Sequence, residues 1–131
     1  MKTNTKRLLS VMLCLAMVLA MLPMAVFAAD DATILYVKPN ALWNQSNARF
    51  AAYFFGNGEA WESMTDADGD GIYECSVPAG MTSVIFVRMN PANIANNWDN
   101  KWNQTGDLTM PTDGKNCFAV NAGEWDGAQG T

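Results

Sequence analysis

The chain has 131 residues and a net charge of −5 at neutral pH, with thirteen Asp and Glu residues, eight Lys and Arg residues and no histidine. An acidic chain of this kind is not expected to bind nucleic acid, because phosphate groups would be repelled. The lack of histidine removes the commonest general base and metal ligand. The length that remains after the leader described next suits one domain with one modest core.

The start of the chain has the order of a bacterial secretory signal peptide. Three cations precede an apolar run from Leu8 to Met21, and small residues around Ala28 offer a cleavage site. We assign residues 1–28 to a cleaved signal peptide and expect residues 30–131 to be secreted. Because no basic stop-transfer flank follows the run, we expect no membrane association after cleavage. Cleavage leaves thirteen carboxylates against five cations, a net charge of about −8.

The mature chain alternates short β-rich segments with turns rich in Gly, Asp and Pro, and it shows no convincing helical period. The two segments that flank the turn Asp66–Gly71 are expected to form a hairpin. Seven or so strands separated by turns predict an all-β fold, a single antiparallel β-sandwich. The expected strands span residues 33–38, 48–55, 61–65, 72–77, 83–89, 107–110 and 116–121.

Alternation along the strand at 48–55 places Phe50 and Phe54 on one face and Tyr53 on the other. One face should meet the core. An outward Tyr53 is either ordinary sheet decoration or a platform for a sugar ring. We expect Trp61, which begins the next strand, to lie near Tyr53 across the turn at Gly56.

All five tryptophans belong to the mature chain, and two of them share the Asn-rich segment 96–105. This segment has neither helical nor strand period, so we expect a loop. A pyranose has an apolar C–H face that can lie on an aromatic ring, and its hydroxyls need the donors and acceptors that side-chain amides supply. Trp98 and Trp102, with neighbouring amides, are therefore candidate sugar contacts. The alternative is that a tryptophan anchors the loop to the core.

The turn Asp66–Gly71 has the Asp-x-Asp-x-Asp-Gly spacing that opens an EF-hand calcium loop. The twelfth position is Val77 in place of the bidentate Glu that such a loop requires. Asp and Gly also favour tight turns for backbone reasons. We interpret it as a plain turn without metal, with calcium as the alternative.

Cys75 and Cys117 both lie in alternating apolar segments. Secretion permits a disulfide between them, and the alternative is that each serves as a small core residue. Two cysteines without histidine make a zinc site improbable on chemical grounds.

A catalytic interpretation finds little support. Glycoside hydrolysis needs two carboxylates at a set separation across a cleft, and nucleophile–base pairs lack their histidine. We expect no enzyme activity and no cofactor. The most clustered carboxylates lie in or near turns and are Glu59, Glu62, Asp66, Asp68 and Asp70.

Several short motifs follow one another along the mature chain. They are Leu35-Tyr36-Val37 with Trp43 after it, the aromatic run Phe50 to Phe55, Trp61 opening the next strand, the segment Met64 to Glu74, Val-Pro-Ala-Gly at Val77 to Gly80, Val-Ile-Phe at Val84 to Phe86, and the segment Gln104 to Leu108. Their order resembles the small starch-binding modules of secreted bacterial amylases, chiefly carbohydrate-binding module family 26. The resemblance covers nearly the whole mature chain.

The resemblance implies an immunoglobulin-like β-sandwich that binds α-1,4-glucan between two aromatic side chains and polar groups. Tyr53 and Trp61 match the strand tyrosine and the following tryptophan of that family. The loop from Met89 to Gln104 is longer than in relatives, which leaves Trp98 or Trp102 as alternative partners of Trp61. The candidate carbohydrate-binding residues are Tyr53, Trp61, Asn97, Trp98, Trp102 and Gln104.

These observations predict a secreted, non-catalytic module for starch or maltooligosaccharides that tethers the glucan to an attached enzyme or to the cell surface. Covalently linked catalytic or anchoring domains are the expected partners, with this chain as a fragment of a larger protein. The alternative is a structural β-sandwich module that binds no sugar. The two differ in whether the candidate rings gather on one exposed face or disperse into the core.

Overall fold

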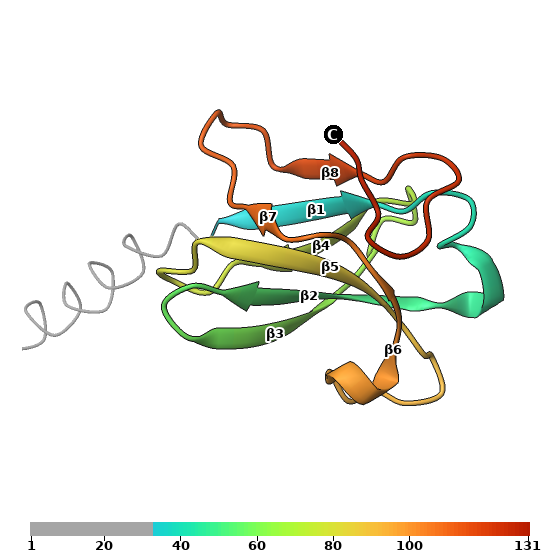
Figure 1. Ribbon diagram of the computed structural model, residues 1–131. Helices are drawn as coiled ribbons and strands as arrows, with labels where there is room; N and C mark the ends of the chain where they lie inside the picture. Colours follow the sequence, from blue (N-terminus) through green and yellow to red (C-terminus); the bar gives the residue numbers. More distant parts are fainter. Residues whose placement is uncertain (1–32) are drawn as a thin grey trace, which may run out of the picture. The chain divides into compact units, whose positions relative to one another are not determined.

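The computed structural model describes residues 33–131, and the expected signal peptide lies outside the described residues. The regular secondary structure of the described part consists of strands, apart from two short 3-10 turns, which confirms the all-β prediction (Figure 1). The strands are β1 (Ile34–Lys38), β2 (Arg49–Phe55), β3 (Glu59–Met64), β4 (Tyr73–Ser76), β5 (Ser83–Met89), β6 (Lys101–Gln104), β7 (Leu108–Thr109) and β8 (Cys117–Ala119); the 3-10 turns are η1 (Gln45–Asn47) and η2 (Trp98–Asn100). No helix in this part is long and apolar enough to cross a membrane.

The strands form two sheets. The smaller has the order β4-β1-β8, and the larger has the order β3-β2-β5-β6, with β7 also paired to β5. The expectation of wholly antiparallel pairing is wrong at one place, because β1 and β8 run parallel, with Tyr36 opposite Cys117. Strand β8 enters from β7, which belongs to the other sheet, so no hairpin turn forces it to reverse beside its neighbour.

The expected hairpin around Asp66–Gly71 is also wrong. Strand β3 lies in the larger sheet and β4 in the smaller one, and the two meet in a single bridge between Thr65 and Glu74. The hairpin at this point of the chain is β2–β3, which pairs from Phe55–Glu59 to Phe50–Met64. Strand β2 pairs with β3 along its whole length, so β4 is not needed as the hairpin partner of β3. The Asp/Gly turn instead leads the chain from one sheet to the other.

The segment 96–105, expected to be a loop, contains both η2 and strand β6. Strand β6 pairs antiparallel with β5, placing Gln104 opposite Val87 and Asn103 opposite Arg88. The register then shifts, and Lys101 faces Met89. Polar residues can form such an edge strand because pairing depends on backbone groups, while hydrophobic alternation reports only which face is buried.

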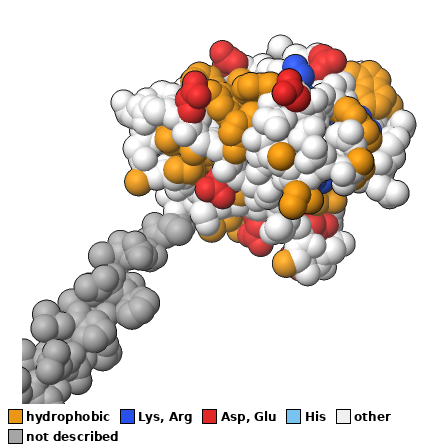
Figure 2. All heavy atoms as spheres, turned by 90° about the horizontal axis from the view of Figure 1, so that it is seen from below, with side chains coloured by type: hydrophobic (Ala, Val, Ile, Leu, Met, Phe, Trp, Pro, Cys, Tyr) orange, Lys and Arg blue, Asp and Glu red, His pale blue; other side chains and the backbone are white. Residues whose placement is uncertain are grey.

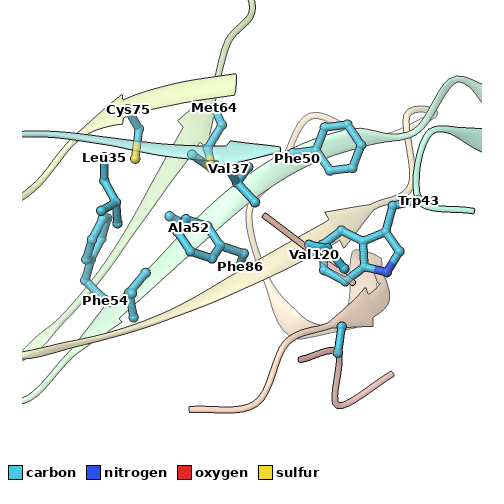
Figure 3. Packing of buried hydrophobic residues seen from close by; sticks show 12 residues of the cluster. Leu35, Val37, Trp43, Phe50, Ala52, Phe54, Met64, Cys75, Phe86 and Val120 are labelled. Carbon is cyan, nitrogen blue, oxygen red and sulfur yellow. The ribbon is translucent and has the colours of Figure 1, made fainter. Parts of the chain in front are cut away.

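The main core lies between the two sheets, as the buried side chains in Figure 3 show. It takes Leu35 and Val37 from β1 and Phe50, Phe54 and Phe86 from the larger sheet. This is the inward face that alternation offered for β2. Fully burying one such side chain contributes roughly 1.5–3 kcal/mol, so this layer supplies most of the driving force for folding.

Trp43 is the tryptophan that belongs to this core. Its ring is fully buried and stacks on Phe50 with the ring centres 6.3 Å apart and the planes 5° from parallel. Its indole N–H donates to the carbonyl oxygen of Trp125 at 3.1 Å, and its backbone N–H donates to Asn40 Oδ1 at 2.8 Å. A large ring with its polar atom satisfied in this way is a structural anchor.

The outward face of the larger sheet is also covered. Ala51, Ile85, Val87 and Met89 form a second buried cluster on it, and Tyr53, Phe55 and Trp61 pack against that cluster. Strand β5 is therefore buried on both faces, which explains its apolar run from Val84 to Val87. The cover on the outward side consists of aromatic rings, and these rings define the candidate site.

The two cysteines within residues 33–131 are free and lie on opposite faces of the smaller sheet. Cys75 is buried and pairs across the sheet with the core residue Leu35, whereas Cys117 is exposed and pairs with Tyr36. Cross-strand partners share a face, and Leu35 and Tyr36 are neighbours that point to opposite sides. The disulfide alternative therefore does not describe this structure, because the two side chains point apart.

Candidate functional site

Three rings gather on the outward face of the larger sheet, and we call them the aromatic cluster: Tyr53, Trp61 and Trp98. The ring centres of Tyr53 and Trp61 are 5.0 Å apart, and Trp98 lies 4.8 Å from each of them. The planes meet at 53° to 65°, so the rings form a folded surface instead of a flat one. Edge-to-face contacts of this kind stabilise each other by about 0.5–1.5 kcal/mol per pair.

The β2–β3 hairpin fixes the first two rings. Tyr53 and Trp61 are direct cross-strand partners, which places both side chains on the same face of the sheet. The turn between them begins at Gly56, whose φ of +76° is unfavourable for other residues, and a Cβ there would run into Thr82. Phe55 extends the surface along β2, with its ring centre 5.8 Å from that of Tyr53. The expected proximity of Tyr53 and Trp61 is thus present.

The segment between β5 and η2 brings Trp98 to the hairpin, and Arg49 holds it. The Arg49 guanidinium donates to the carbonyl oxygens of Asn93 and Ala95 at 2.9 and 2.7 Å, and to Asn96 Oδ1 at 2.6 Å. Asn96 Nδ2 in turn donates to Ser63 Oγ on β3 at 3.0 Å. A single cation at the start of β2 therefore ties the loop to the strands that carry the other two rings.

The aromatic cluster is open to solvent although its base is closed. Trp98 is 41% exposed, and Tyr53 and Trp61 are half-buried. Ile85, opposite Tyr53 on β5, is buried beneath them. The rings of Tyr53 and Trp61 pack against this apolar floor, and the open side of the cluster is where a ligand could replace water.

Polar groups stand beside Trp98. Lys101 Nζ lies 5.9 Å from the Trp98 ring centre and donates to Gln104 Oε1 at 2.8 Å. Asn97 caps η2, because its Oδ1 accepts the backbone N–H of Asn100 at 3.0 Å. The cap uses the oxygen of Asn97, which leaves its amide nitrogen as the group that could donate to a ligand.

The Glu59 carboxylate lies beside the cluster, next to Tyr53. The pKa of the Tyr53 hydroxyl is raised, first by burial among its neighbours and then by the Glu59 carboxylate on the adjacent strand. Tyr53 therefore stays a neutral hydroxyl at physiological pH, able to donate and accept. Figure 2 shows the η2 side of the molecule, with hydrophobic side chains between scattered acidic groups and few basic ones.

Trp102 does not join the aromatic cluster. It is the extra residue where the β5–β6 register shifts, and its ring lies over the Arg88 guanidinium with 4.7 Å from carbon to ring centre. Arg88 shares the core-facing side of β5 with Phe86, whereas the cluster lies on the other side. Of the six candidate residues, the structure thus brings Tyr53, Trp61 and Trp98 together, places Asn97 and Gln104 beside them, and sends Trp102 elsewhere.

The Asp66–Gly71 turn holds three carboxylates, from Asp66, Asp68 and Asp70, whose nearest oxygens lie within 4.8 Å of one another. Asp66 already accepts the backbone N–H groups of Asp70 at 3.1 Å and Gly71 at 2.9 Å. Desolvation tends to raise the pKa of Asp66, but these hydrogen bonds lower it on balance. The carboxylates could contact a cation, yet their backbone contacts alone account for the turn.

No match to this chain was found among protein-family models, curated proteins or solved structures. A function for this chain is therefore inferred from its residues and their geometry.

Three residues that hold or contact the exposed indoles were not predicted from the sequence: Arg49, Arg88 and Trp125. The signal that could have drawn attention to the arginines is their rarity, because residues 30–131 contain two arginines and each is inside or at the end of a β-rich segment. Trp125 lies between two turns of the C-terminal segment, where no pattern predicts its neighbours.

Proposed function

We propose that this protein is a secreted, non-catalytic carbohydrate-binding module with an immunoglobulin-like β-sandwich fold, and that its ligand is an α-1,4-glucan such as starch or a maltooligosaccharide. The observation that carries the proposal is the aromatic cluster. A monomeric domain seldom leaves rings of this size open to water without a binding role. If the protein were a structural module without a ligand, the candidate rings would be buried at separate places in the core, as Trp43 is buried.

The geometry of the cluster favours a curved glucan. The three rings meet at large angles, so two rings can contact two sugar residues only if the chain bends between them. An α-1,4 chain curves in this way, whereas a flat β-1,4 chain would fit rings in a common plane. Asn97, Lys101 and Gln104 lie close enough to Trp98 to serve the hydroxyl edge of a stacked glucose.

The placement of carboxylates supports binding without hydrolysis. Glu59 and Trp61 share one face of β3, and Glu62 points to the other face. The remaining clustered carboxylates belong to the Asp66–Gly71 turn. A glycosidase would need two carboxylates facing each other across the bound sugar, and the residues around the aromatic cluster supply Glu59 alone on that face of β3.

The expected affinity is modest. One stacked ring removes a few tens of Å² of apolar sugar surface from water, which is worth about 1–2 kcal/mol. Two or three rings with hydrogen bonds, less the cost of association, suggest a dissociation constant of roughly 10 μM to 1 mM. Such a module would act by raising the effective concentration of an attached enzyme or cell surface at the polymer.

Retention on insoluble starch, followed by titration with maltohexaose and cellohexaose, tests the proposal. We expect retention, saturable binding of maltohexaose and much weaker binding of cellohexaose. Equal binding of both sugars would defeat the α-glucan assignment while keeping a carbohydrate function. No heat and no change in tryptophan fluorescence at millimolar concentrations of either sugar would favour the structural-module alternative.

A further inference from the structure

A second pair of exposed indoles lies apart from the aromatic cluster, on the core-facing side of β5. Trp102 is 36% exposed and Trp125 is 39% exposed. The guanidinium carbon of Arg88 lies 4.7 Å from the ring centre of Trp102 and 5.3 Å from that of Trp125. The two rings therefore flank one cation and are close enough for a single oligosaccharide to reach both.

Arg88 is a fixed support for these rings. It is 6% exposed, and its guanidinium donates to the carbonyl oxygens of Trp43 and Gln45 at 2.8 and 2.7 Å. It also donates to Asn103 Oδ1 at 3.0 Å. Because these hydrogen bonds fix its position, the Arg88 guanidinium supports both indoles from the protein side. Solvent therefore reaches the opposite faces and the edges of the two rings. Rings held in place before binding lose little entropy when a ligand docks.

We propose that Trp102 and Trp125 form a second glycan-binding surface, which shares no side chain with the aromatic cluster. Polar groups stand next to the rings: Asn103 Nδ2 donates to Asp126 Oδ2 at 3.2 Å, and Asp126 Oδ1 accepts the backbone N–H of Gln104 at 3.3 Å. Carboxylate and amide oxygens accept hydrogen bonds from sugar hydroxyls.

The chemistry around the pair selects a neutral ligand. The donors of Arg88 are turned to protein oxygens, so they are not free to bind an anion, and Asp126 would repel one. The ring faces already carry the Arg88 cation, which would repel a second cation at the same rings. A neutral sugar needs only apolar ring surface and hydrogen-bond partners, and this surface has both.

A second surface would add to the retention of the protein on a polymer. When one site is occupied, the other meets the same chain at a high effective concentration. The inference does not require the aromatic cluster to bind, because the ligand class is argued from the Trp102–Trp125 pair itself.

Indole N–H signals in nuclear magnetic resonance spectra of the ¹⁵N-labelled protein separate the two surfaces. We would titrate maltoheptaose and cellohexaose into the unaltered protein and into a Trp61→Ala, Trp98→Ala double variant, with the backbone amide of buried Cys75 in the smaller sheet as the internal control. The signals of Trp102 and Trp125 are expected to shift saturably in both proteins with at least one sugar, while the Cys75 amide signal stays unmoved.

This inference would be overturned if the signals of Trp102 and Trp125 stay constant with both sugars up to about 10 mM, because a site that weak would hold almost no sugar. Loss of their shifts in the double variant would also overturn it, because the surface would then depend on the aromatic cluster. If Trp102 and Trp125 move in the unaltered protein while Trp61 and Trp98 do not, the second surface stands and the proposed role of the cluster fails.

Discussion

Tyr53 and Trp61 face each other directly across the β2–β3 hairpin, with ring centres 5.0 Å apart and planes 53° from parallel. Strand pairing makes them neighbours, and Trp98, from the segment that follows β5, contacts both rings. Backbone register therefore decides which two rings meet on the hairpin, and a segment far along the chain adds the third.

Trp61→Ala should remove starch retention while leaving the fold intact, because Trp61 is half-buried on the outward face. Trp43→Ala is the matched control: Trp43 is fully buried in the core, so its loss should cost about 3–5 kcal/mol of unfolding free energy. Thermal melting and starch retention, measured on both variants, separate the two roles. A Trp61→Ala protein that unfolds would move Trp61 from the site to the core.

Arg49→Lys should weaken sugar binding more than it weakens the fold. A lysine keeps the charge but cannot make the three separate hydrogen bonds that Arg49 directs to Asn93, Ala95 and Asn96. Loosening the loop should let Trp98 leave its two partner rings, with roughly a tenfold loss of maltoheptaose affinity, about 1.4 kcal/mol. Lys115→Arg, on an exposed loop away from the cluster, is the control for exchanging lysine and arginine at a position without these hydrogen bonds. Unchanged affinity in Arg49→Lys would show that Trp98 is held by its ring contacts alone.

Gln104→Ala should reduce affinity for maltooligosaccharides by about 0.5–1.5 kcal/mol, because a sugar hydroxyl that loses this partner can turn to water. The same change frees Lys101, whose ammonium now donates to Gln104. Asn97→Ala is expected to have a similar effect on binding and, through loss of the η2 cap, a small effect on stability. Titration calorimetry gives both affinities. If either variant lost more affinity than Trp61→Ala does, the amides, and not the rings, would be the main contacts of the site.

Alkaline pH should destabilise the protein through Cys75. Burial raises the pKa of the Cys75 thiol to about 12 from 9.0, with a smaller contribution from Glu62. The folded state therefore holds its proton more tightly than the unfolded state, so this contribution to stability is complete below pH 9 and declines as pH rises from 9 toward 12. Urea unfolding at a series of pH values should show the decline, and Cys75→Ala should reduce it. A Cys75→Ala profile with the same alkaline slope as the unaltered protein would assign that slope to other groups.

The Asp66–Gly71 turn should not need calcium. Val77 occupies the position of the bidentate ligand in a calcium loop, and the Asp66 carboxylate is already engaged by the backbone of Asp70 and Gly71. We expect the melting temperature to be the same with about 1 mM calcium, which would fill a sensor-type calcium loop, and with excess chelator. A clear drop on adding chelator would show that the three aspartates hold a cation.

The depressed pKa of Asp66 adds a test at acidic pH. A carboxyl whose folded pKa lies below its unfolded value contributes stability above the unfolded pKa and loses it as pH falls through the folded value. Asp66→Asn should therefore lower the melting temperature at pH 7 and have less effect at pH 3.

The sequence by itself determined the strands that carry their own hydrophobic alternation or turn chemistry. The strands around Phe54 and Phe86 could be placed from residue type alone, and so could the proximity of Tyr53 and Trp61 across Gly56, because hairpin register follows from a short turn. The buried, unpaired state of Cys75 could not, since it depends on which face of β4 meets the core.

The tertiary structure decided how distant segments meet. Strand β6 has polar residues and was visible only through its pairing with β5, and the register shift there turned Trp102 away from Trp98 and onto Arg88. The sheet change after β3, the parallel β1–β8 pair and the contact of Trp125 with Arg88 likewise join segments with no shared local pattern. Local propensity acts over a few residues, whereas these contacts follow from how two sheets bury a common core.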